Sequence, residues 1–84
     1  MPIISRFYGI TIKMYFSQSE HNPPHIHATY GDNIAALIIA DGSLLEGHLP
    51  PKALSMVREW IKENRKDLMH IWNSQEFKAL KPLE

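Results

Sequence analysis

The sequence predicts an α+β domain in which a four-stranded antiparallel meander sheet is followed by two C-terminal helices packed on one sheet face. Four short segments between residues 10 and 49 have strand character and are separated by turn residues. Pro50-Pro51 ends this region, and apolar residues then recur at helical spacing. Because 84 residues is the size of one small domain, we expect residues 1–84 to form a single unit.

The composition excludes several classes of protein. Nine basic and nine acidic residues give zero formal net charge, so any contact with RNA requires a local basic patch. The absence of cysteine excludes disulfides and thiolate metal sites. No apolar run approaches the roughly 20 residues of a membrane span, and the N-terminus has no signal pattern. We therefore expect a cytoplasmic protein without a membrane partner.

The first predicted strand covers residues 10–16 and follows a lead-in segment, residues 1–9, for which we predict no strand. Its residues alternate between two faces, which is typical of a half-buried strand. One face is predicted to be core and carries Ile10, Ile12, Met14 and Phe16, and the other carries Thr11, Lys13 and Tyr15.

The second predicted strand covers residues 25–30, after a polar loop that ends in Pro23-Pro24. Proline lacks the N–H group that a sheet ladder needs, so the pair favours a loop before the strand. The alternation places His25 and His27 on one sheet face and Ile26 and Ala28 on the other. We expect the histidine face to be partly open to solvent.

The third and fourth predicted strands cover residues 33–40 and 43–49. The third is apolar on both faces, which favours a central position in the sheet. Asp41-Gly42 between them is a strong hairpin signal. Glu46 and His48 fall on one face of the fourth strand.

The helices are predicted at residues 51–64 and 67–74, with a tail at residues 75–84. Pro51 suits the first helical position, and the apolar residues recur every three or four positions. One continuous helix is the alternative to a break near residue 64. In the tail, Phe77 and Leu80 are candidates for docking, whereas Lys81-Pro82 is expected to be frayed. The apolar helical stripe consists of Ala53, Met56, Val57, Trp60, Ile61, Leu68, Ile71 and Trp72.

The candidate functional segment is Glu20-His21-Asn22-Pro23-Pro24-His25-Ile26-His27, which holds three of the five histidines. As a metal site, His25 and His27 would chelate one divalent transition metal, since alternate strand residues lie about 6–7 Å apart. His21 would be the third ligand, with Glu46 and His48 as weaker candidates.

The same three histidines, His21, His25 and His27, are the candidate catalytic residues of a metal-free site. A histidine pair suits base and acid in RNA cleavage because imidazole titrates near neutrality. Lys13 and Tyr15 would then help to hold a phosphate. Two further interpretations remain open: a recognition surface for a partner protein or a second copy, and a purely structural role of half-exposed histidines.

The sequence also resembles the small prokaryotic domain-of-unknown-function family 4160. The resemblance rests on residues 21–27, Gly47 to Leu54, Val57-Arg58-Glu59-Trp60 and Ile71-Trp72, and it covers about residues 1–72. It implies a bacterial, cytoplasmic protein similar to the toxin half of a two-gene toxin–antitoxin module, with a small antitoxin-like partner. It implies no catalytic mechanism. The residues that match the family motif are His21, Pro23, Pro24, His25 and His27.

We therefore predict a toxin-like component whose active or recognition site is the His21–His27 segment. One alternative is a hydrolase acting on RNA or another phosphate ester, with or without a metal. The other is a non-catalytic protein-interaction module that works as a dimer or in a partner complex.

Overall fold

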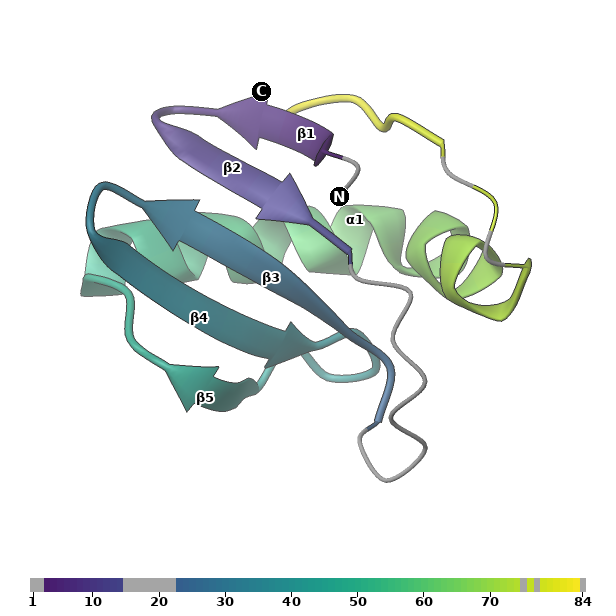
Figure 1. Ribbon diagram of the computed structural model, residues 1–84, viewed down its shortest axis with the longest axis horizontal. Helices are drawn as coiled ribbons and strands as arrows, with labels where there is room; N and C mark the ends of the chain where they lie inside the picture. Colours follow the sequence, from purple (N-terminus) through teal and green to yellow (C-terminus); the bar gives the residue numbers. More distant parts are fainter. Residues whose placement is uncertain (1–2, 15–22, 75, 77, 84) are drawn as a thin grey trace.

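The computed structural model describes the chain except residues 1–2, 15–22, 75, 77 and 84, and it confirms the α+β class (Figure 1). Five strands precede one long helix. The elements are β1 (Ile3–Phe7), β2 (Ile10–Lys13), β3 (His25–Tyr30), β4 (Asn33–Ile38), β5 (Leu44–Gly47) and α1 (Pro51–Ser74).

The sheet is a meander in which each strand lies antiparallel to the next, in the order β1-β2-β3-β4-β5. The predicted count of four strands is wrong, because the supposed lead-in segment contains β1. Ile4 and Ser5 are both buried, since the register with β2 shifts between Ile3 and Ser5. This irregularity removes the alternation that would have revealed the strand. Tyr8 and Gly9 then form the tight turn into β2, with φ values of 50° and 81°.

Strand bounds differ from the predictions mainly at the carboxyl ends. Residues 25–30 form β3 as predicted, whereas β4 ends at Ile38 instead of residue 40, and β5 spans 44–47 instead of 43–49. β2 ends at Lys13 instead of residue 16, although Tyr15 and Phe16 lie outside the described residues. The predicted hairpin is confirmed, because β4 and β5 pair antiparallel. Its connection is longer than the predicted Asp41-Gly42 turn: residues 39–43 join the two strands, and the Gly42 amide donates to the Ile38 carbonyl at 2.7 Å.

The helices predicted at residues 51–64 and 67–74 belong to one element, α1, in place of the two separate helices we predicted, but the predicted break near residue 64 is present as a kink. Asn64 has non-helical angles (φ −117°, ψ 17°) inside α1. Its side-chain amide donates to the Trp60 carbonyl at 2.9 Å. The helix continues beyond this kink because its apolar stripe continues, with Leu68 and Ile71 fully buried.

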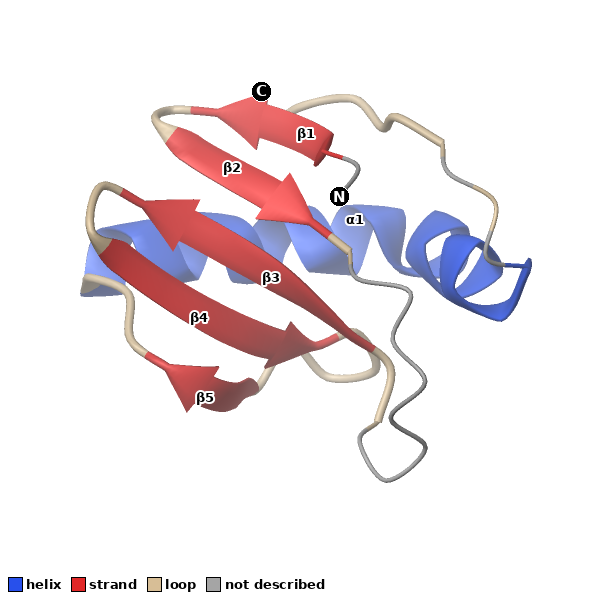
Figure 2. Ribbon diagram, in the orientation of Figure 1, coloured by secondary structure: helices blue, strands red, loops and turns tan. Residues whose placement is uncertain are grey.

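Helix α1 covers one face of the sheet, and within the described residues no helix covers the other face (Figure 2). On the covered face, Ile10, Ile12 and Met14 are fully buried, which confirms the predicted core face of β2. Trp60 lies in this core, with its ring centroid 5.8 Å from that of Phe7.

The C-terminal tail packs along β1. The Leu80 amide donates to the Ile4 carbonyl at 2.8 Å, and the Trp60 indole N–H donates to the Lys81 carbonyl at 2.8 Å. Leu83 is buried as well. The docking of Leu80 is confirmed, and the expectation that Lys81-Pro82 is frayed is wrong at Lys81. Phe77 lies outside the described residues.

Candidate functional site

The open sheet face carries one row of residues that crosses four strands. Lys13 lies opposite His27, His27 opposite Ala36, and Ala36 opposite Glu46. Residues directly opposite each other in antiparallel strands project from the same face. His25 shares this face because it precedes His27 by two positions on β3. The small Ala36 side chain leaves room between the imidazole of His27 and the carboxylate of Glu46.

His25 is held in one orientation by its neighbours. Its Nδ1 lies 2.8 Å from the Pro23 carbonyl oxygen. Because a carbonyl can only accept, Nδ1 donates this hydrogen bond, and Nε2 is the nitrogen left to exchange a proton. The Trp72 ring centroid lies 5.3 Å from that of His25. We expected the histidine face to be partly open to solvent. The His25 side chain is an exception, because it is only 7% exposed.

The two imidazoles are close neighbours. The ring centroids of His25 and His27 are 5.2 Å apart, and the rings meet edge to face at 64°. Burial, followed by the charge of His25, lowers the pKa of His27, and the charge of Glu46 partly opposes this shift. His27 is therefore neutral at pH 7, the state in which imidazole accepts a proton or binds a metal ion. Since a charge on one ring disfavours a charge on the other, the pair suits one base and one acid.

The remaining predicted site residues are distributed differently. His21, with the rest of residues 15–22, lies outside the described residues, so the three-histidine site stays a prediction. His48 follows the end of β5 and is exposed, with its backbone amide donating to the Ile34 carbonyl. Within the described part of the chain, no three His, Cys, Asp or Glu side chains are grouped so as to hold a metal ion. No metal-binding group is thus formed by the described candidates alone, which are His25, His27, Glu46 and His48.

Two contributions to this site were missing from the sequence analysis. Trp72 was assigned to the core, and it does pack there, but it also covers His25. Arg6 on β1 lies opposite Thr11 and brings a second cation to the open face. Arg6 was missed because the sequence does not predict β1. Trp72 was missed because no local pattern indicates that residue 72 reaches the start of β3.

These features define a small α+β domain with a histidine pair on the open face of an antiparallel sheet. The chain matches the family described as Domain of unknown function (DUF4160) over residues 9–73, and it belongs to that family. The match confirms the resemblance, although it begins at residue 9 and not at the first residue. Comparisons with curated proteins and with solved structures gave no match. Among the described residues, no helix is both long and apolar enough to cross a membrane.

Proposed function

We propose that the protein is the toxin component of a two-gene toxin–antitoxin module in the bacterial cytoplasm, and that it cleaves RNA on the open sheet face. The observation that carries this proposal is the pair of imidazole rings, 5.2 Å apart, with Lys13 in register beside one of them. The chain belongs to the DUF4160 family. The toxin-like role extends what the sequence resemblance implies.

RNA brings its own nucleophile, so a base, an acid and a cation suffice for the chemistry. Neutral His27 takes the proton of the 2′-hydroxyl, and the 2′ oxygen attacks the adjacent phosphorus. The bond from phosphorus to the 5′ oxygen breaks, and protonated His25 gives its Nε2 proton to that oxygen. The products are a 2′,3′-cyclic phosphate and a 5′-hydroxyl. The Lys13 ammonium group offsets the charge that develops on the phosphoryl oxygens.

Local charge favours an anionic substrate although the whole chain is neutral. Among the described strand residues that project from the open face, Arg6 and Lys13 are cations and Glu46 is the carboxylate. Thr11 and Thr29 lie opposite each other between these groups and add hydroxyls. This excess of positive charge supports contact with RNA, which a neutral chain makes through a local basic patch.

The assignment of base and acid is tested with two substrates, an RNA oligonucleotide and uridine 3′-(p-nitrophenyl phosphate). Nitrophenolate leaves without a proton, so the second substrate needs the base but not the acid. We expect His27→Gln to lose about 100-fold or more in rate on both substrates. His25→Gln should lose a similar factor on RNA and much less on the nitrophenyl ester.

His70→Gln is the matched control, because His70 is an exposed histidine that belongs to α1 and not to the sheet. It should cleave both substrates at the wild-type rate. Equal losses on both substrates for His25→Gln would contradict its role as the acid. Full activity of His27→Gln on RNA would refute the cleavage site altogether.

A second candidate function, protein recognition without catalysis, is favoured by exposed apolar residues near one sheet edge. Ile34 is 60% exposed and Leu44 is 44% exposed. Leu44 belongs to β5, the last strand of the sheet, and an edge strand of this kind accepts a partner strand. A partner surface here predicts that Leu44→Ser abolishes association, and that the wild type itself does not cleave RNA. Loss of association in His27→Gln, with no cleavage by the wild type, would favour recognition at the histidines instead.

A further inference from the structure

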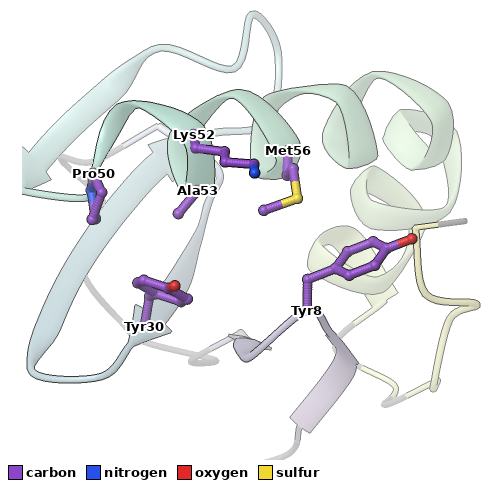
Figure 3. Close-up of a pocket in the computed structure, with 6 residues that line it drawn as sticks. All are labelled: Tyr8, Tyr30, Pro50, Lys52, Ala53 and Met56. Atoms are coloured by element: carbon purple, nitrogen blue, oxygen red, sulfur yellow. The ribbon is translucent and has the colours of Figure 1, made fainter.

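A concave site lies on the helix side of the sheet, at the other end of β3 from His25. It is a pocket of about 370 Å³, within the size range of small-molecule sites. Tyr8 comes from the β1–β2 turn and Tyr30 from the end of β3 (Figure 3). Pro50 directly precedes α1, and the other lining residues come from the first two turns of that helix. The lining residues are Tyr8, Tyr30, Pro50, Lys52, Ala53 and Met56.

Both tyrosine rings are held in place without a ligand. Phe7 meets Tyr8 edge to face, with ring centroids 6.4 Å apart, and Phe7 itself packs on Trp60 in the core. The Tyr30 ring lies beside Gly9, where an added Cβ would be at ordinary contact distance, 3.4 Å, from the ring. Tyr8 is 61% exposed and Tyr30 37% exposed, so their surfaces are available to a ligand. A preorganised pair of this kind binds with little ordering cost.

The charge of the pocket is positive. Lys52 is the charged residue of the lining, and Figure 3 shows its side chain running along the helix towards Met56, across from the two rings. The first turn of α1 contains no acidic residue, so the positive end of the helix dipole is not offset by a side chain there. A ligand that matches this lining has a flat aromatic part and an anionic part.

We propose that this pocket binds a nucleoside phosphate, with the base against Tyr8 and Tyr30 and the phosphate at Lys52. Tyrosine rings stack on every nucleobase, and the polarisable Met56 sulfur completes an apolar wall. The nucleoside phosphate is either a free nucleotide or one unit of a single RNA strand. The proposal does not depend on cleavage at His27, because the pocket lies on the other side of the sheet.

The test is calorimetric titration of the full chain with AMP, adenosine, inorganic phosphate and a 2′-O-methyl tetra-adenylate that cannot be cleaved. We expect saturable binding of AMP, with adenosine and phosphate each at least about tenfold weaker. Tyr30→Leu and Lys52→Gln should each weaken AMP binding about tenfold. Lys52→Gln should also remove the preference for AMP over adenosine. Tetra-adenylate binding tighter than AMP identifies RNA as the source, and equal binding identifies a free nucleotide.

Further variants separate the loss of a ligand contact from poor folding of a single variant. Tyr8→Asn removes the second ring with a residue that tolerates the positive φ of this turn position, and it should also weaken AMP binding. Lys62→Gln, which removes an exposed lysine elsewhere on α1, should bind AMP like the wild type. So should His27→Gln. Equal affinity of the wild type for AMP and adenosine, or loss of AMP binding in His27→Gln, would overturn the proposal.

Discussion

The two faces of the sheet differ in what they contribute. On the covered face, Ile12, Ala28 and Leu37 are fully buried beneath α1. One residue along the same strands, Lys13, His27 and Ala36 lie in the row that carries the charged and titratable groups. Core residues and titratable residues are thus separated by a single step along each strand. Substitutions on the two faces should therefore have opposite signatures.

The largest effect is expected in the core beneath the helix. Trp60→Ala should lower the free energy of unfolding by about 3–5 kcal/mol, because Trp60 is fully buried and its indole N–H anchors the tail at Lys81. A domain of this size has about that much stability in total, so the variant should be largely unfolded. Urea denaturation followed by circular dichroism checks this. A midpoint within experimental error of the wild type would contradict the described core.

The next largest effect is expected at Gly47, where β5 ends. Its φ is +84°, and an added Cβ would lie 2.8 Å from the Ala35 Cα and clash with the Ile34 carbonyl oxygen. Gly47→Ala should cost about 2 kcal/mol or more, since left-handed strain adds to the clash.

Gly31→Ala is the matched control for Gly47→Ala, because its φ is +61° and nothing lies within 4 Å of the added Cβ. It should cost only about 1 kcal/mol, the strain alone. The same denaturation experiment measures both variants. Equal costs would show that the backbone contact at Gly47 is not tight.

A smaller effect is expected from the titration of His27 on the open face. Its pKa is lowered in the folded protein, so the unfolded chain takes up the proton first as the pH falls below about 6.5. The unfolded state then binds more protons, and stability falls until the pH passes below the folded pKa. The stability advantage of the wild type over His27→Gln should therefore shrink between pH 8 and pH 5.

Urea denaturation at a series of pH values measures this difference. Glu46→Gln should make stability fall more steeply as the pH is lowered. The Glu46 charge partly offsets the lowering of the His27 pKa, and the variant lacks that charge. If the stability difference between the wild type and His27→Gln does not change with pH, the folded structure does not shift the pKa of His27.

The smallest effect on stability is expected at Lys13. Lys13→Gln should change the free energy of unfolding by less than about 0.5 kcal/mol, because the side chain is on the open face and only partly buried. The rate of RNA cleavage should nevertheless fall about tenfold, through loss of a cation beside the phosphate. Lys62→Gln should change neither quantity. A loss of stability without a loss of cleavage rate would show that Lys13 contributes to folding and not to cleavage.

Much of the fold was predictable because local patterns dominate it. The alternation in residues 25–30 predicted β3 correctly, and Asp41-Gly42 predicted that a hairpin joins β4 to β5. β1 was not predictable, because its bulge removes the alternation and Tyr8 takes a positive φ that residues other than glycine rarely adopt. The continuity of α1 across Asn64 was left open, since it depends on packing against the sheet.

The candidate site was predictable only in part. That His25 and His27 share a face follows from strand geometry. The position of Glu46 depends on the register across Ala36, and the burial of His25 depends on the path of α1 to Trp72. The tyrosine pocket combines two turns and a helix start, so no single stretch of sequence indicates it.

The central claim is that the open face cleaves RNA while the covered face holds the fold. The most direct measurement is the cleavage rate of a single-stranded RNA by purified wild type and His27→Gln, together with the chemistry of the product ends and the urea midpoint of each protein. We expect 2′,3′-cyclic phosphate ends from the wild type. His27→Gln should react about 100-fold or more slowly with a nearly unchanged midpoint at pH 8. Equal cleavage rates, or a loss of rate that follows only from unfolding, would contradict the claim.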